Sequence, residues 1–436
     1  MKKPELLAPA GTLNNMRYAF AYGADAVYAG QPRYSLRVRN NDFQDENLAL
    51  GIEEAHRQGK KFYLTSNLMP HNSKIKTYLK DMQNVVGMGP DALIMADPGL
   101  IMMAREAWPD MPIHLSVQAN TVNYAAVKFW QSAGIERIIL SRELSLEEIE
   151  EIRQQCPDME LEVFVHGALC IAYSGRCLLS GYFNHRDPNQ GTCTNACRWE
   201  YQTTPATENS SGVFKPAPSV LGDGERRAEA DQIYLLEEKG RPGEHMPIME
   251  DEHGTYIMNS KDLRAVEHVE RLVKMGIDSL KIEGRTKSHY YVARATQSYR
   301  QAIDDAAAGK RFDPSLLGTL ENLANRGYTD GFFQRHHTHE YQNYIQGNSL
   351  SRQQQFVGEV VAYDAESGMA DIVVKNKFSI GDRLELIGPE GNRDLILEHM
   401  TNRRGEILET APGSGYEVRI PLPPVAGPFN MLARYL

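Results

Sequence analysis

Four of the five cysteines in this 436-residue chain stand close together, with the spacing C-x6-C-x15-C-x3-C. They are Cys170, Cys177, Cys193 and Cys197. Thiolates are soft ligands, and four of them hold either a tetrahedral zinc ion or an iron–sulfur cluster. The first pair is too wide for a zinc knuckle, and nearby glycines leave room for a larger group. The spacing therefore favours a cluster, with zinc or unligated thiols as the alternatives.

A charged motif, "LKIEGR", is the second candidate for chemistry. Lys281 and Glu283 alternate with the apolar Ile282, and Arg285 follows. On a strand covered by helices, charges on one face point inward and need partners. A site in which Lys281 and Glu283 are catalytic and Arg285 binds substrate explains the motif better than a structural salt-bridge network.

Five further polar residues are candidates because of where they stand. Arg37 and Arg39 follow an apolar run, and their guanidinium groups suit a carboxylate or a phosphate, unless the loop is simply solvated. Asn67 and Gln118 close apolar runs, where an amide reads a base edge or caps a loop. His166 is either a catalytic group or a buried core histidine.

The elements that must position these residues alternate along the chain. Apolar runs such as "ELLAPAG", "ADAVYAG" and "KKFYLTSN" are each followed by a segment with helical spacing, up to "ELEVFVHGALC" as the seventh strand. This alternation predicts βαβ units, and its short loops favour a (β/α)8 TIM-like barrel over a doubly wound sheet. The segments "AVEHVERLVKMG" and "DSLKIEGR" are expected to close the barrel.

Composition changes divide the chain into two predicted domains. Residues 1–335 form the barrel, with an insertion at about 200–256 that is rich in Ser, Thr, Pro and Gly. After a linker at 336–354, short alternating strands in residues 355–436 predict a small β-barrel module. The cysteines and the insertion follow the seventh strand, at the end of the barrel where active sites lie.

Charge and hydropathy limit the kinds of partner that the protein can bind and the cellular compartment in which we expect it. The net charge of −10 repels phosphate, so a nucleic-acid partner needs a local basic patch. No apolar run approaches the roughly 18 residues that cross a membrane, and Pro4, Glu5 and Pro9 interrupt any signal-peptide core. We therefore expect a cytoplasmic protein, in which disulfides are rare and clustered cysteines bind metal or act in redox chemistry.

The cysteine region also carries a family resemblance. The segment "ELEVFVHGALCIAYSGRCLLS" matches every position of the signature of peptidase family U32, the collagenase-like protease family, which this chain resembles. The segments "LLAPAG", "NSKDL", "LKIEGR" and "NRGYTDGF" look like its other blocks. The resemblance covers about residues 5–336, and the C-terminal module looks like the extension of one branch.

Despite the family's name, this resemblance implies a hydroxylase. The branch with this length is similar to enzymes that make 5-hydroxyuridine at the wobble position of tRNA, without molecular oxygen and with prephenate as co-substrate. It implies a [4Fe–4S] cluster on the four cysteines, and the tRNA anticodon loop as partner. Arg37, Arg39 and Arg285 would then hold the prephenate dicarboxylate or an RNA phosphate. Tyr290 and Tyr291 are able to stack a base, although core packing is the commoner use of tyrosine.

Three other functions stay open at the level of sequence. One is a collagenase-like peptidase, although the chain has neither H-E-x-x-H nor G-x-S-x-G. Another is a non-enzymatic, metal-stapled RNA-binding module. The last is a hydroxylase of quinone rings, whose family branch tends to lack the C-terminal module.

Overall fold

The computed structural model describes residues 2–31, 33–36, 42–169, 261–325, 327–334, 354–425 and 427–436, and the backbone of six short strands between residues 206 and 255. None of the helices in these ranges combines the length and the apolar character that a bilayer crossing requires.

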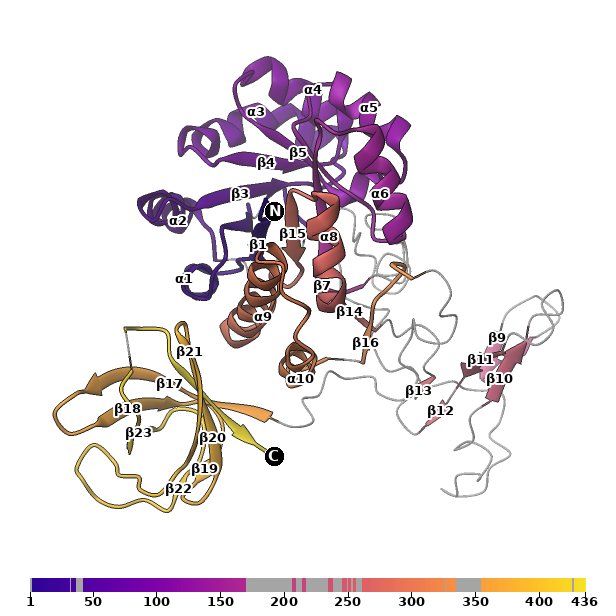
Figure 1. Ribbon diagram of the computed structural model, residues 1–436. Helices are drawn as coiled ribbons and strands as arrows, with labels where there is room; N and C mark the ends of the chain where they lie inside the picture. The colour runs from indigo at the N-terminus through magenta and orange to yellow at the C-terminus, as the bar shows by residue number, and fades with distance from the viewer. Residues whose placement is uncertain are drawn as a thin grey trace.

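A closed barrel of parallel strands forms the larger part of the fold (Figure 1). The strands are β1 (Glu5–Pro9), β2 (Ala26–Gly30), β3 (Lys61–Ser66), β4 (Ala92–Met95), β5 (Ile113–Leu115), β6 (Arg137–Ile139), β7 (Glu160–Ala168) and β15 (Ser279–Ile282). Each strand pairs with the next, and β15 closes the ring by pairing with both β7 and β1. This confirms the predicted (β/α)8 fold.

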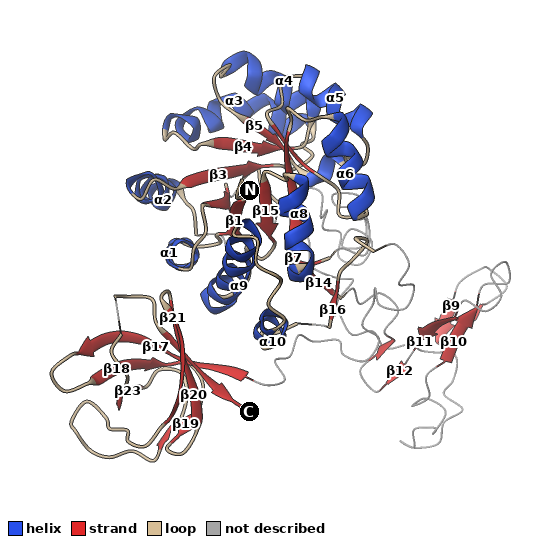
Figure 2. Cartoon of the chain, viewed as in Figure 1, coloured by secondary structure: helices blue, strands red, loops and turns tan. Residues whose placement is uncertain are grey.

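Helices cover the outside of the barrel (Figure 2). They are α1 (Leu13–Ala21), α2 (Asp45–Arg57), α3 (Asn72–Gly87), α4 (Pro98–Ala107), α5 (Tyr124–Ser132), α6 (Leu146–Gln155), α8 (Val269–Met275) and α9 (His289–Ala307). Local capping fixes where several begin: Ser145 and Glu148 form a capping box at α6, and the Asp97 side chain accepts from Leu100 N at α4. Because helices bury the outer face, the strands read as nearly continuous apolar runs.

The end of β7 carries additional elements that the sequence did not predict. Strand β14 (Asp262–Arg264) pairs antiparallel with it, and β16 (Tyr328–Thr329) extends the sheet. Helix α10 (Ser315–Glu321) and the 3₁₀ turn η5 (Val266–His268) complete this part, and a second 3₁₀ turn, η1 (Val117–Ala119), follows β5. The insertion contains three two-stranded pairs. They are β8 (Ala206–Glu208) with β9 (Phe214–Pro216), β10 (Tyr234–Glu237) with β11 (His245–Ile248), and β12 (Glu250–Asp251) with β13 (Gly254–Thr255).

The C-terminal module is all-β, as predicted, and has its own apolar core. Its main sheet has the order β21-β20-β24-β17-β18-β23. The strands are β17 (Gln354–Asp364), β18 (Met369–Val374), β20 (Arg383–Gly388), β21 (Gly391–Ile396), β23 (Glu417–Pro421) and β24 (Met431–Tyr435), with β19 (Phe378–Ser379) and β22 (Thr410–Ala411) as a separate pair. Ile387, Met431 and Ala433 pack into the core of the barrel, so the module is docked on the barrel.

Candidate active site

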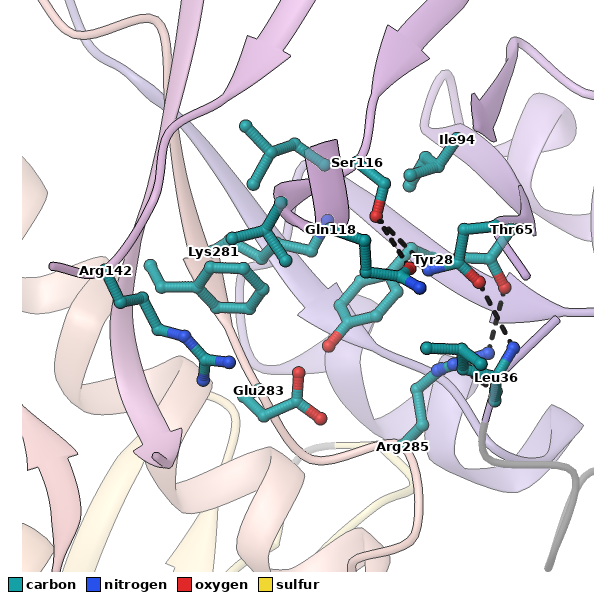
Figure 3. A pocket seen from close by; sticks show the side chains of 14 residues that line it. Tyr28, Leu36, Thr65, Ile94, Ser116, Gln118, Arg142, Lys281, Glu283 and Arg285 are labelled. Carbon is teal, nitrogen blue, oxygen red and sulfur yellow. Dashed lines mark hydrogen bonds between the residues drawn. The ribbon is translucent and has the colours of Figure 1, made fainter. Parts of the chain in front are cut away.

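A cavity of ≈ 90 Å³ opens at the carboxyl ends of the barrel strands (Figure 3). This is the end at which barrel enzymes carry their active sites. The cavity is lined by Tyr28, Leu36, Thr65, Asn67, Ile94, Ser116, Val117, Gln118, Ile139, Arg142, Phe164, Lys281, Glu283 and Arg285. Five residues predicted from the sequence therefore meet in one place, although they come from three distant parts of the chain.

Lys281 forms the floor of this cavity. Its Nζ donates to Glu162 Oε1 at 2.7 Å and lies 4.3 Å from the centre of the Tyr28 ring. Burial lowers the pKa of Lys281, and the neighbouring Glu162 carboxylate acts in the opposite direction. The Lys281 side chain is thus a buried cation that is paired with Glu162 on the side of the barrel interior and lines the cavity on the other side.

Below Lys281, the barrel interior holds an ionic layer, which consists of Glu5, Arg137, Glu162 and Lys281, and the half-exposed Glu160 lies at its rim. The Arg137 guanidinium contacts three carboxylates, at 2.5 Å for Glu5, 2.8 Å for Glu160 and 3.3 Å for Glu162. Tyr63 and Ser279 also donate hydrogen bonds to Glu5. These charges compensate one another, so the salt-bridge network that the sequence left as an alternative exists, but it lies one layer beneath the cavity.

Arg285 stands on one wall, where backbone and side-chain oxygens fix its guanidinium. It donates to Thr65 Oγ1 at 2.9 Å and to the Leu36 carbonyl at 2.5 Å. The side chain is 7% exposed, so its charge is held in a largely water-free position. An arginine oriented in this way is suited to a carboxylate or a phosphate.

A chain of polar groups continues this wall beyond Leu36. Asn67 accepts from Leu36 N at 3.2 Å and donates to Ser116 Oγ at 3.3 Å, and Ser116 in turn donates to Gln118 Oε1 at 3.1 Å. The Nε2 of Gln118 is buried and has no hydrogen-bond partner within the described part of the chain. An unsatisfied buried donor costs free energy, so a ligand acceptor at this point would be favourable.

Arg142 is a lining residue that the sequence reasoning missed. It follows β6 in "SREL", donates to the Ala168 carbonyl at 2.8 Å and lies 4.8 Å from the centre of the Phe164 ring. The signal was its position directly after a barrel strand. With Arg142, the lining holds three cations (also Lys281 and Arg285) and one carboxylate (Glu283), a formal balance of +2. A chain of net charge −10 thus has a locally positive cavity.

His166 lies outside the cavity because of an irregularity in β7. The register shifts so that Phe164 pairs with Lys281 but His166 pairs with Ile282. Since Phe164 and Lys281 face the interior, the extra residue turns His166 outward, toward the helical layer. Its catalytic role stays a prediction, but the structure buries it completely among tyrosines. The rings of Tyr291, Tyr299 and Tyr328 lie 5.4–5.7 Å from its own.

Gly167 allows the close approach of two strands beside the cavity. Its φ is +105°, and a Cβ atom there would lie 2.5 Å from the Glu283 carbonyl. Any larger residue would push β7 away from Glu283. This gives a physical reason for glycine at that point of the signature segment.

Several predicted residues lie outside the described residues. They are Arg37, Arg39, Cys170, Cys177, Cys193 and Cys197. Cys156 is described: it ends α6, is buried, and its Sγ lies 3.7 Å from the Tyr124 carbonyl. Cys156 is thus a buried cysteine at the end of a helix, away from the other four in the sequence.

Comparison with known proteins decides the family. The profile of peptidase family U32 matches residues 11–343, and that of the peptidase family U32 C-terminal domain matches residues 352–434. The chain belongs to peptidase family U32. Within this U32 family, the tRNA hydroxylation protein P of Escherichia coli (strain K12) is 66% identical over 432 residues, which cover 97% of this chain and 94% of that protein.

Two further U32 relatives show the range of names in the family. The tRNA hydroxylation protein P of Haemophilus influenzae (strain ATCC 51907 / DSM 11121 / KW20 / Rd) is 61% identical over 434 residues, or 97% of this chain and 94% of that protein. A protein named collagenase from Porphyromonas gingivalis (strain ATCC BAA-308 / W83) is 27% identical over 452 residues, which cover 99% of this chain and 97% of that protein. The chain is thus far more similar to the relatives named for tRNA hydroxylation.

Proposed function

We propose that this chain is a tRNA-modifying enzyme that hydroxylates carbon 5 of the wobble uridine. The observation that carries this proposal is the 66% identity, over nearly the full length, to a relative named tRNA hydroxylation protein P. The collagenase relative is only 27% identical, so the peptidase alternative has much weaker support. A tRNA substrate also implies a cytoplasmic enzyme.

The polar wall of the cavity supports a pyrimidine ligand. Uracil has two ring carbonyls that accept hydrogen bonds, and the Gln118 Nε2 is a buried donor in need of an acceptor. The anticodon loop is single-stranded, so turning its uridine into a protein cavity costs less than from a duplex. Glu283 is the carboxylate in the lining, and we assign to it the removal of the proton from carbon 5.

We infer that prephenate is the co-substrate, as the family resemblance implies. Charge supports this inference, because the lining combines Arg142, Lys281 and Arg285 with a single carboxylate. Two guanidinium groups suit a dicarboxylate, since each matches the geometry of one carboxylate group. Leu36, whose carbonyl orients Arg285, directly precedes the predicted ligand Arg37 in the chain.

We also propose that Cys170, Cys177, Cys193 and Cys197 hold a [4Fe–4S] cluster, with zinc as the alternative. The support is donor chemistry, since four soft thiolates stand together in a chain with only one other cysteine. In the chain, Cys170 comes two residues after the last residue of β7. When bound, such a cluster supplies one-electron transfer.

The function is tested by mass spectrometry of tRNA nucleosides. Cells that lack this chain, and any redundant hydroxylase, should lose 5-hydroxyuridine and its derivatives, and the gene on a plasmid should restore them. Purified protein should form 5-hydroxyuridine on unmodified tRNA only when prephenate is added. If the nucleoside persists in the deletion strain, the proposal is wrong.

The cluster is tested by iron and sulfide analysis after anaerobic purification. Cys197→Ala should lose iron and sulfide, because a cluster with three ligands is labile. Cys156→Ala is the matched control and should keep both, because its thiol is buried against Tyr124. Protein that contains one zinc ion and no iron would exclude the cluster.

A further inference from the structure

A second cavity, of ≈ 410 Å³, lies at the seam between the barrel and the C-terminal module. We call it the seam cavity. The start of α9 (Lys287, Ser288 and Tyr290) lines it from the barrel, and the start of β17 (Gln355 and Phe356) lines it from the module. In Figure 1 these elements face one another between the two parts of the molecule. Its volume is in the range of pockets that bind small molecules or single nucleotides.

The seam is a fixed interface, so this cavity is preformed. Arg294 on α9 forms a buried ion pair with Glu385 of the module at 3.0 Å. The Tyr22 hydroxyl contacts the carbonyls of Ile387 and Phe429 at 3.1 and 2.8 Å. A ligand therefore meets walls that are already in place, which reduces the entropic cost of binding.

One wall of the seam cavity is aromatic. The rings of Tyr290 and Phe356 are stacked, with centroids 4.8 Å apart and planes 18° apart. Tyr290 is buried, whereas Phe356 is only partly buried. Every nucleobase has an apolar face that stacks on aromatic side chains, and such contacts tolerate different bases.

The same cavity has a positive side. Lys287 lies directly before the N-terminus of α9, a helix of 19 residues whose Ser288 caps it through Tyr291 N. Helix N-termini attract anions, and a lysine beside one strengthens this attraction. An aromatic wall next to a cation and a helix N-terminus matches a nucleotide, with its base and phosphate, better than an apolar peptide.

One short segment of the chain connects the lining of the active-site cavity to that of the seam cavity, and Tyr291 of the seam cavity donates to the Glu283 carbonyl at 3.2 Å. Glu283 and Arg285 line the active-site cavity, and Lys287 and Ser288 line the seam cavity. A chain of four residues spans at most about 14 Å, so Glu283 and Lys287 are no farther apart than that. A short single strand of RNA can bridge this distance.

We propose that the seam cavity binds an unpaired nucleotide of the RNA substrate that neighbours the uridine in the barrel. The nucleotide stacks on the aromatic wall formed by Tyr290 and Phe356, and Lys287 contacts its phosphate. This inference rests on the proposed tRNA function and deepens it, since it gives the C-terminal module a share in substrate binding.

Photocrosslinking with the full-length protein tests the placement. A synthetic anticodon stem-loop carries a single 4-thiouridine, either at the target position or at a neighbouring loop position. We expect the target probe to label peptides of the active-site cavity, and a neighbouring probe to label the peptide with Tyr290 or Phe356. The proposal is wrong if the neighbouring probes label only the barrel outside the seam.

Two substitutions test the contacts through equilibrium binding of the same stem-loop. Phe356→Ala should weaken binding about tenfold, the usual loss for one stacked base. Lys287→Gln should make the dependence of log Kd on log salt shallower by roughly 0.7, as for one lost phosphate contact on a single strand. Phe129→Ala, at an aromatic ring that is 62% exposed on α5, and Lys80→Gln on α3 are the matched controls.

The outcomes separate this inference from the function itself. If Phe356→Ala does not fold, the Lys287→Gln result decides. Wild-type affinity and salt dependence for Lys287→Gln overturn the seam proposal and leave the hydroxylase proposal intact. If the deletion strain keeps its 5-hydroxyuridine, the hydroxylase proposal fails first.

Discussion

The ionic layer and the active-site cavity above it are built from the same kinds of side chain, but these side chains are paired differently. In the ionic layer, Arg137 contacts three carboxylates, and Glu5 receives hydrogen bonds as well. In the cavity, Gln118 keeps a donor without a partner in the described residues, and cations outnumber carboxylates. The difference teaches that a buried donor which no described residue satisfies, as at Gln118, marks the ligand site, whereas the ionic layer serves the fold.

Arg137→Ala is the variant with the largest expected effect, and it tests whether the ionic layer stabilises the fold. The buried carboxylate of Glu162 and the largely buried one of Glu5 would lose their shared cation, and breaking such a pair costs about 3–5 kcal/mol of unfolding free energy. Urea unfolding measures this loss. Arg57→Ala, in an exposed pair with Glu53, is the control and should cost at most about 0.5 kcal/mol. Equal losses for both variants would contradict a structural role for the ionic layer.

His166 sharpens the comparison. It lies on β7, the strand that carries Glu162 of the ionic layer, but its side chain faces the helices. Burial lowers the pKa of His166 to about 3, below the usual value of 6.5. The unfolded chain therefore binds more protons between these values, and stability falls as the pH drops from 6.5 toward 3. Between pH 7 and pH 5, His166 lowers the free energy of unfolding by about 2 kcal/mol.

The free energy of unfolding of a His166→Phe variant, measured at pH 7 and at pH 5, tests this effect of His166. The variant should lose about 2 kcal/mol less than the wild type between pH 7 and pH 5. Phe129→Leu, at an exposed ring on α5 that carries no titratable group, should follow the wild type. If the His166→Phe variant shows the wild-type pH dependence, the neutral buried state of His166 is wrong.

Lys281→Met tests the residue that the two layers share. Glu162 would keep its contact with Arg137, so the stability loss should stay near about 1–2 kcal/mol. Formation of 5-hydroxyuridine should fall about a hundredfold or more, as for the loss of an acid–base group. Hydroxylation and urea unfolding, measured on the same preparation, separate the two effects. A stable variant with wild-type hydroxylation would assign Lys281 to the ionic layer alone.

Gln118→Leu should have the smallest effect on stability. Removing the Nε2 donor, which has no partner among the described residues, relieves a cost, whereas losing the hydrogen bond from Ser116 to Oε1 adds one. The two effects oppose each other, so the unfolding free energy should stay within about 1 kcal/mol of the wild type. Hydroxylation should still fall about tenfold, because one hydrogen bond to the base is lost. Steady-state kinetics with tRNA measures this. A clear loss of stability with unchanged kinetics would show that Gln118 serves the fold.

The barrel could be predicted from the sequence because its cause is local. Each strand is covered by helices, so each appears as an apolar run, and each helix has its own period and caps. Lys281, Glu283 and Arg285 were also predictable, because charges inside such a run break the pattern. Asn67 and Gln118 follow the same logic at strand ends.

Other features depend on contacts between distant segments and leave no local signal. The register shift in β7 is invisible, because "EVFVH" reads as a regular alternation that would turn His166 inward. The pairing of Arg294 with Glu385 joins a helix to a module 91 positions away. The seam that it fixes therefore emerges only in the folded chain.

The pairing of β14 with the end of β7 has a further consequence for how this family can vary. Ala168 lies opposite Asp262, so the two ends of the segment between residues 169 and 261 are side by side. For a flexible segment with joined ends, each doubling of length costs only about 0.6 kcal/mol in closure entropy. The segment between residues 169 and 261 could therefore be lengthened, shortened or replaced by another sequence while the barrel stays closed.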